Sequence, residues 1–272
     1  MESIKTQDIA IPKLGLGTFR MQGDSCRAAV ESALALGYRH IDTAEMYGNE
    51  EAIGAAIAAS RVPRGELHVT TKVWVDNLTP AAIRKAFDTS LNKLRLDRID
   101  LYLVHWPSRG MNLPSVLEAM IGLKQEGRTR AIGVANFTTA LLKVAVEEVR
   151  APIACNQVEY HVMLDQSKLR KYLAAHDIPL VAYCPLAQGR VASDAALAKI
   201  GRKHHASAAQ VALKWLLDQE GVAAIPKASR AESQKANLAA LKLTLDDDDR
   251  REIAALPKDR RCVNPGFGPD WD

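Results

Sequence analysis

The sequence predicts an α/β protein with the architecture of a (β/α)8 barrel, and three observations support this fold class. Short apolar runs rich in β-branched residues recur throughout the 272 residues. Most of these runs are continuously apolar instead of alternating, as expected of strands buried on both faces of a parallel sheet. Helical patterns alternate with them, and no linker or change of composition divides the chain. We therefore expect a single barrel domain over residues 1–272.

The expected strands are eight runs. In chain order they are LGLGTF from residue 14, HIDTA from 40, LHVTTKV from 67, IDLYLVH from 99, RAIGVAN from 130, IACNQVEY from 153, IPLVAYC from 178 and VAAIPKA from 222. Residues 2–12 precede the first strand and are expected to form a short β-hairpin that closes the bottom of the barrel. A doubly wound sheet is the alternative. It would normally carry a GxGxxG motif, and here Gly15 and Gly17 have no third glycine in register.

The intervening helices carry start signals. Thr79 predicts an N-cap, and Pro80 suits the first turn that follows it. Ser207 and Gln210 have the spacing of a capping box. The acidic run at 246–249 is typical of a helix N-terminus, where the helix dipole favours negative charge.

Composition narrows the class of protein. With 47% apolar and 25% charged residues, the chain resembles ordinary soluble globular proteins. It has no apolar run approaching about 18 residues and no apolar segment at its start, so we expect no membrane span and no signal peptide. The net charge of +4 is spread along the chain, which argues against a nucleic-acid partner. Four widely spaced cysteines form no CxxC pair, and we expect a cytoplasmic monomer with reduced thiols.

Reactive side chains follow three successive strands of the predicted barrel. Asp42 lies at the tip of the second strand and Tyr47 in the loop after it. Lys72 ends the third strand and His105 ends the fourth. The carboxyl ends of barrel strands converge on one site, and neighbouring strands lie about 4.8 Å apart. Each residue taken singly has a structural explanation, such as a helix cap for Asp42, but their occurrence on adjacent strands favours one functional pocket.

These side chains suit protonation of an oxygen on which negative charge develops. A lysine ammonium beside a phenol lowers the pKa of the phenol, which would make Tyr47 a usable general acid. Asp42 can hold Lys72 in an ion pair, and a neutral His105 can orient a carbonyl oxygen by a hydrogen bond. The sequence lacks paired carboxylates at glycosidase spacing, a nucleophile beside a base, and HxH or HExxH metal patterns. We therefore predict carbonyl reduction by a hydride donor, without a metal.

A set of motifs resembles the successive signatures of the aldo-keto reductases. The motifs are GLGTFR, HIDTAEMYGNE, TTKVW, LVHWP, IGVANF, NQVEYH and IPKAS, and they cover nearly the whole chain. The resemblance implies a (β/α)8 barrel that binds NADPH across its mouth without a Rossmann motif and reduces aldehydes and ketones. The catalytic Asp, Tyr, Lys and His of the family match Asp42, Tyr47, Lys72 and His105.

The resemblance also implies positions that bind the nicotinamide half of the cofactor. Asn136 and Gln157 match the pair that binds the carboxamide, although the serine that usually precedes this asparagine is Ala135 here. Tyr183 matches the aromatic residue that stacks on the nicotinamide ring. The further cofactor contacts implied are Gly17, Thr18, Asp42, Cys184, Pro185 and Leu186.

The segment IPKASRAESQKAN resembles the family's site for the 2′-phosphate and adenine. Lys227 and Asn237 match the family pattern. Ser229 and Arg230 can compensate for the departures from it, since a guanidinium binds phosphate in a bidentate manner. The departures are Ala228, Ser233 and Ala236.

The expected substrate pocket is partly aromatic. Phe19, Trp74, His105 and Trp106 match positions that line it in the family. The loop at 107–114 and the tail NPGFGPDWD, which can fold over the mouth, are both short. An open pocket with little lid suits small carbonyl substrates such as methylglyoxal, diketo sugar acids including 2,5-diketo-D-gluconate, and simple aromatic aldehydes.

Two other functions remain open from the sequence. One is a nucleotide-sensing module of the same fold, as in the channel β-subunits that resemble this family. The other is a metal-dependent barrel hydrolase. The complete set of four catalytic positions favours the reductase, because a pure sensor has less reason to keep Tyr47 beside Lys72.

Overall fold

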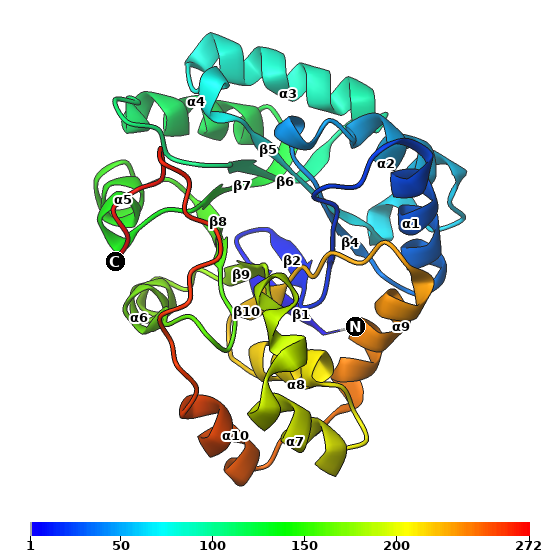
Figure 1. The fold of residues 1–272 in the computed structure, drawn as a ribbon. Helices are drawn as coiled ribbons and strands as arrows, with labels where there is room; N and C mark the ends of the chain where they lie inside the picture. Colours follow the sequence, from blue (N-terminus) through cyan, green and yellow to red (C-terminus); the bar gives the residue numbers. More distant parts are fainter. Residues whose placement is uncertain (1) are drawn as a thin grey trace.

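The computed structural model describes residues 2–272, and its centre is a ring of parallel strands surrounded by helices (Figure 1). Eight strands form one sheet in the order β10-β9-β8-β7-β6-β5-β4-β3. Their bounds are β3 Leu16–Gly17, β4 His40–Asp42, β5 His68–Val73, β6 Ile99–Val104, β7 Thr129–Ala135, β8 Ile153–Glu159, β9 Leu180–Tyr183 and β10 Val222–Ala224.

The sheet closes on itself beside its first strand. Parallel bridges join Leu14 to Ala224 and Gly17 to Lys227, so the chain around β3 pairs with β10 and with the residues after it. This closure confirms the (β/α)8 barrel, and the doubly wound alternative is wrong because an open sheet would leave both edge strands unpaired.

The hairpin predicted before the barrel is also confirmed. Strands β1 (Ser3–Thr6) and β2 (Ile9–Pro12) pair in antiparallel register. Ile9 and Ile11 pack against the apolar residues inside the barrel, and the Thr6 hydroxyl donates to the Ala154 carbonyl at 3.0 Å. The hairpin therefore closes the amino-terminal end of the barrel and leaves the opposite end to the site.

The helices lie outside the strands. Their bounds are α1 Gly23–Ala35, α2 Glu50–Ala59, α3 Pro80–Leu94, α4 Leu113–Gln125, α5 Thr139–Lys143, α6 Ser167–Ala175, α7 Ala195–Lys203, α8 Ala208–Leu217, α9 Ala231–Ala239 and α10 Asp247–Ala254. The predicted caps are confirmed: Thr79 accepts from the backbone N–H of Ala82, and Ser207 with Gln210 forms a capping box. Asp246 with Asp249 forms another at the start of α10.

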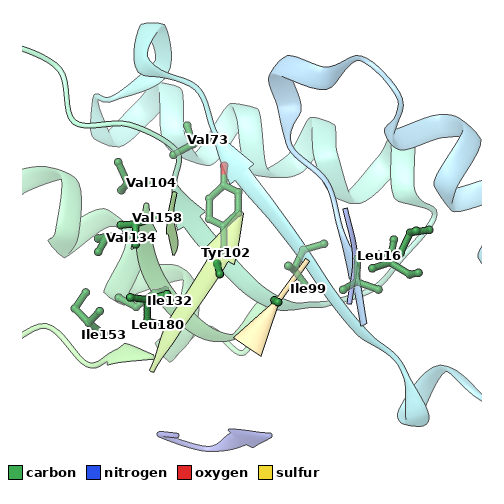
Figure 2. Close-up of a cluster of buried hydrophobic side chains, with 14 of the residues drawn as sticks. Leu16, Val73, Ile99, Tyr102, Val104, Ile132, Val134, Ile153, Val158 and Leu180 are labelled. Atoms are coloured by element: carbon green, nitrogen blue, oxygen red, sulfur yellow. The ribbon is translucent and has the colours of Figure 1, made fainter. Parts of the chain in front are cut away.

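The core lies on both faces of the barrel strands. Along β6, Leu101 and Leu103 point into the barrel, whereas Tyr102 and Val104 pack against the helices. Figure 2 shows part of this outer layer, with Tyr102 between the side chains of neighbouring strands. Burial on both faces explains why the strands are continuously apolar in sequence.

No helix within residues 2–272 is both long enough and apolar enough to span a membrane.

Candidate active site

A pocket of about 780 Å³ opens at the carboxyl ends of the barrel strands. It contains most of the site residues predicted from the sequence. These are Gly17, Thr18, Phe19, Asp42, Tyr47, Trp74, His105, Trp106, Asn136, Gln157, Tyr183, Cys184, Pro185, Leu186 and Lys227. Lys72 lies beneath the pocket floor, fully buried against Asp42. The pocket therefore brings together side chains from strands that are far apart in sequence.

The backbone turns sharply where it leaves several strands. Arg20, Asn136 and Cys184 all line the pocket and have left-handed φ angles of 60°, 62° and 48°. This conformation is uncommon for residues other than glycine and costs about 1–3 kcal/mol. The surrounding packing therefore has to hold the backbone in place at these three positions of the pocket wall.

The pocket floor contains a buried ion pair. Lys72 Nζ donates to Asp42 Oδ1 at 2.7 Å and to the carbonyl oxygen of Thr43, also at 2.7 Å. Gln157 Nε2 donates to the other carboxylate oxygen of Asp42 at 2.7 Å. Burial lowers the pKa of Lys72, and the charge of Asp42 opposes that effect. The pair thus links β4, β5 and β8 directly below the pocket.

Tyr47 lies above this ion pair. Its ring centroid is 5.1 Å from Lys72 Nζ and 5.5 Å from the ring centroid of His105. Burial and then the charge of Asp42 raise the pKa of Tyr47 well above its usual value. This differs from the lowering expected from the sequence, because burial of the phenol and the charge of Asp42 outweigh the positive charge of Lys72. Tyr47 consequently keeps its proton across the physiological pH range.

Two residues that sequence reasoning missed hold the 3-10 turn Glu45–Tyr47 in place. Glu45 accepts from the Trp74 backbone N–H at 2.9 Å and from Asn77 Nδ2 at 2.5 Å. Asn49 Nδ2 donates to the Thr18 carbonyl at 2.9 Å. Both belong to the motif HIDTAEMYGNE, but their roles depend on distant partners that the motif does not reveal.

His105 faces the same pocket as a neutral imidazole. Burial and then the nearby charge of Lys72 lower the pKa of His105 well below its usual value. Its Nδ1 is buried and has no hydrogen-bond partner within residues 2–272. The ring packs edge-on against Trp74, with 5.1 Å between centroids. A neutral ring fixed in this way can donate a hydrogen bond to a ligand, and its low pKa keeps it from taking up a second proton.

The predicted nicotinamide contacts form one network. Tyr183 donates from its hydroxyl to Asn136 Oδ1 at 2.7 Å, and Asn136 Nδ2 donates to the His105 carbonyl at 2.9 Å. The side-chain amide of Gln157 donates to Asp42 through Nε2. Its oxygen has no hydrogen-bond partner among the described residues and faces the pocket. An acceptor and amide groups at this position suit a carboxamide ligand.

The predicted phosphate segment is only partly in the pocket. Lys227 lines it, whereas Ser229, Arg230 and Asn237 do not. Lys227 Nζ donates to the Ser229 hydroxyl at 3.4 Å, and Arg230 is the N-cap of α9 without a side-chain cap hydrogen bond. Asn237 is buried within α9. Lys227 therefore places one positive charge on the pocket wall, and α9 begins four residues after it with an N-terminus that no side chain caps.

The part of the pocket predicted to hold the substrate has aromatic walls. Phe19, Trp74 and Trp106 line it as predicted, and the C-terminal chain adds Phe267. The ring of Phe267 packs edge-on against Trp74 and Trp106, with centroids 5.9 and 5.7 Å apart. The short C-terminal tail was expected to leave the pocket open, but it supplies part of the pocket wall. The lining residues missed from the sequence are Arg20, Met46, Gln188, Gly189, Ile225, Pro226, Val263, Pro265 and Phe267.

Comparisons with known proteins identify the family of this chain. A sequence profile of the Aldo/keto reductase family matches residues 13–258. The chain is 43% identical over 268 residues to methylglyoxal reductase DkgB of Escherichia coli O157:H7, which covers 97% of this chain and 100% of that protein. It is 39% identical over 263 residues to glyoxal reductase of Bacillus subtilis (strain 168), covering 96% and 94% of the two chains.

Solved structures agree as well. A protein assigned as a 2,5-diketo-D-gluconic acid reductase B superposes with a TM-score of 0.96 at 39% identity, covering 100% of this chain and 98% of that chain. The aldo-keto reductase AKR2E5, solved in complex with NADPH, gives a TM-score of 0.92 at 29% identity and covers 100% and 92%. Profile, relatives and fold thus agree over nearly the whole chain, and this protein belongs to the aldo-keto reductase family of NAD(P)H-dependent oxidoreductases.

Proposed function

We propose that this protein reduces small aldehydes and ketones to alcohols with NADPH as the hydride donor and Tyr47 as the general acid. The observation that carries the proposal is the placement of Tyr47 and His105 together over the buried pair of Asp42 and Lys72. A proton donor, a neutral hydrogen-bond donor and a buried ion pair in one pocket suit the stabilisation of an oxygen that becomes negatively charged.

The residues of the pocket fit a nicotinamide dinucleotide. The volume of the pocket, about 780 Å³, falls in the range of about 300–1,000 Å³ typical of organic ligand sites. Asn136 and Gln157 offer amide groups at one end, and Lys227 offers an ammonium at the other. Tyr183 would pack against the nicotinamide ring, and Cys184 to Leu186 would follow the pyrophosphate. Bound NADPH would supply the hydride.

The chain's own residues deal with the carbonyl oxygen. His105 donates a hydrogen bond that orients the oxygen and polarises the carbonyl group. As negative charge develops, Tyr47 transfers the proton of its hydroxyl to that oxygen. A raised pKa does not prevent this step, because an alkoxide is a much stronger base than a phenolate. Lys72, held by Asp42, then stabilises the phenolate through its positive charge.

The substrate class follows from the walls of the pocket. Phe19, Trp74 and Trp106 present aromatic surface, which suits aldehydes with an apolar or aromatic group as well as compact dicarbonyl compounds. The two curated relatives named above are a methylglyoxal and a glyoxal reductase, which supports methylglyoxal as a substrate here. The similarity to the diketogluconic acid reductase supports 2,5-diketo-D-gluconate.

The test is the oxidation of NADPH by purified protein supplied with methylglyoxal or benzaldehyde. We expect turnover by the wild type and a loss of about 10²–10⁴-fold in kcat for Tyr47→Phe, because general acid catalysis contributes by that order. NADPH binding, measured by fluorescence titration, should stay within about twofold. Tyr172→Phe is the matched control, since the hydroxyl of this tyrosine donates to Glu147 on the outer surface, away from the pocket. Full activity in Tyr47→Phe would refute the assignment of the acid.

A further inference from the structure

Glu159 is a buried carboxylate that the proposed reaction does not use. It lies at the end of β8, two residues after Gln157, and is fully inaccessible to solvent. Its Oε1 accepts from the Cys262 backbone N–H at 2.6 Å, and its Oε2 accepts from the Val263 backbone N–H at 2.8 Å. One carboxylate thereby binds two consecutive peptide groups that lie about a hundred residues further along the chain.

His161 completes this arrangement. Its Nδ1 accepts from the Met163 backbone N–H at 3.3 Å, so the neutral ring carries its proton on Nε2. That nitrogen donates to Glu159 Oε1 at 2.9 Å. Burial alone would raise the pKa of Glu159, but the hydrogen bonds from His161, Cys262 and Val263 outweigh it and hold the pKa below its usual value.

The same three side chains, Glu159, His161 and Cys262, lie close enough to suggest a metal site. Their hydrogen bonds argue for a different role. Both oxygens of Glu159 already accept backbone N–H groups, and His161 Nε2 carries a proton that it donates. Ligation by Nε2 would place the proton on Nδ1, directly opposite the N–H of Met163. The cluster is therefore built to hold the backbone of the tail.

Apart from the two bonds to Glu159, side-chain contacts hold most of the C-terminal tail, residues 261–272. Trp271 Nε1 donates to Asn264 Oδ1 at 2.8 Å, and the Trp271 ring packs against Trp106 and under Arg261. The tail contains no helix or strand, and within these residues the only backbone–backbone hydrogen bond runs from Gly268 to Pro265. The tail runs from α10 past α6 toward α5 (Figure 1). Its far end is attached where Asp272 accepts from the N–H and hydroxyl of Thr139. Between these two attachments the tail supplies the wall containing Phe267.

We propose that Glu159, held by His161, is a positioning residue that fixes the tail as a wall of the substrate pocket and so controls the binding of aromatic aldehydes without taking part in proton or hydride transfer. The proposal rests on the proposed function. Val263, which Glu159 anchors, lines the pocket, and so do Pro265 and Phe267, which follow it. A shift of the tail backbone at the anchor would therefore move the ring of Phe267 away from Trp74 and Trp106.

The test compares Glu159→Gln and Phe267→Ala with the wild type. Glutamine has the shape of glutamate, but its amide N–H₂ would face at least one of the three donors. We expect amide hydrogen exchange at Cys262 and Val263 to accelerate by about tenfold or more, because charge-assisted hydrogen bonds are lost. KM for benzaldehyde should rise about fivefold or more, while kcat for methylglyoxal should change less than about twofold. Phe267→Ala should reproduce the KM effect with slow exchange retained at both amides.

The control is Glu118→Gln, an exposed glutamate on α4 without a hydrogen bond or ion pair among the described residues. Unchanged exchange and unchanged KM in Glu159→Gln would overturn the proposal. If that variant does not fold, the wild type still decides: rapid exchange at Cys262 and Val263 would show that no anchor exists. If the wild type reduces no aldehyde, the proposed function fails. The anchor would still be supported in that case if amide exchange at Cys262 and Val263 is slow in the wild type and fast in Glu159→Gln.

Discussion

At the scale of single residues, the candidate site depends on charges balanced inside the barrel. Asp42 and Lys72 are both buried, and each would cost several kcal/mol without its partner. The sequence allowed this pair to be predicted because both residues follow neighbouring parallel strands. It did not allow the direction of the shift in the Tyr47 pKa to be predicted, because that direction depends on how deeply the phenol is buried and on how close it lies to Asp42.

Besides the Tyr47→Phe test above, a prediction at the scale of residues concerns the choice between NADPH and NADH. Lys227 lines the pocket and, with Arg230, offers positive charge near the N-terminus of α9, which favours a cofactor with a 2′-phosphate. We expect kcat/KM to be higher with NADPH than with NADH. Lys227→Ala should raise KM for NADPH about tenfold, as one ion-paired hydrogen bond is lost, and leave KM for NADH nearly unchanged.

The control for this measurement is Lys235→Ala, since this lysine is exposed on α9 and lies outside the pocket. Steady-state kinetics with both cofactors check the prediction. Equal catalytic efficiency of the wild type with NADPH and NADH would contradict the role assigned to Lys227 and Arg230.

At the scale of elements, the strands and caps could be predicted and the tail could not. Strands buried on both faces have a continuous apolar pattern, and the cap at Thr79 is a local signal. The path of the tail has no such pattern, because Glu159 binds the backbone of Cys262 and Val263, whose side chains are not involved. The same limit applies to Asn237, which matches the family motif yet lies buried in α9.

The packing of α2 on α3 gives a prediction at this scale. Gly54 lies in α2, and a Cβ added there would be 2.5 Å from the Lys93 carbonyl oxygen and 2.6 Å from that of Leu94. These are backbone atoms at the end of α3, so the helices would have to separate. Gly54→Ala should lower the free energy of unfolding by about 1–3 kcal/mol, although alanine by itself favours a helix by about 1 kcal/mol.

Gly122 provides the matched control, since it is also a glycine inside a helix. A Cβ there would lie 2.9 Å from Arg84 Nη2 and 3.9 Å from Glu126 Oε1, which are the ends of two long, exposed side chains that can shift together. Gly122→Ala should therefore leave the free energy of unfolding unchanged or raise it by up to about 1 kcal/mol. Urea unfolding measures both variants, and equal effects of the two substitutions would show that the close approach of α2 and α3 does not limit stability.

At the scale of the whole molecule, the two ends of the barrel serve different purposes. The carboxyl end holds the pocket, while the amino-terminal end contains two histidines on neighbouring strands, His40 and His68. Their ring centroids are 4.6 Å apart, and His68 Nε2 is buried without a partner within residues 2–272. Burial is the main cause that lowers the pKa of both rings, and that of His68 is well below its usual value.

These buried histidines make the stability of the barrel depend on pH. The unfolded chain binds protons near the ordinary histidine pKa of about 6.5, whereas the folded rings bind them only at lower pH. The contribution of these rings to stability is therefore full above about pH 6.5 and declines as the pH falls below it, by about 1.4 kcal/mol per pH unit for each ring that stays neutral. Urea unfolding at a series of pH values should show this slope, and His68→Gln should reduce it by about one proton. His205→Asn, at an exposed position, should leave the slope unchanged. A wild-type stability that stays constant between about pH 7 and pH 5 would mean that the rings accept protons within the folded barrel.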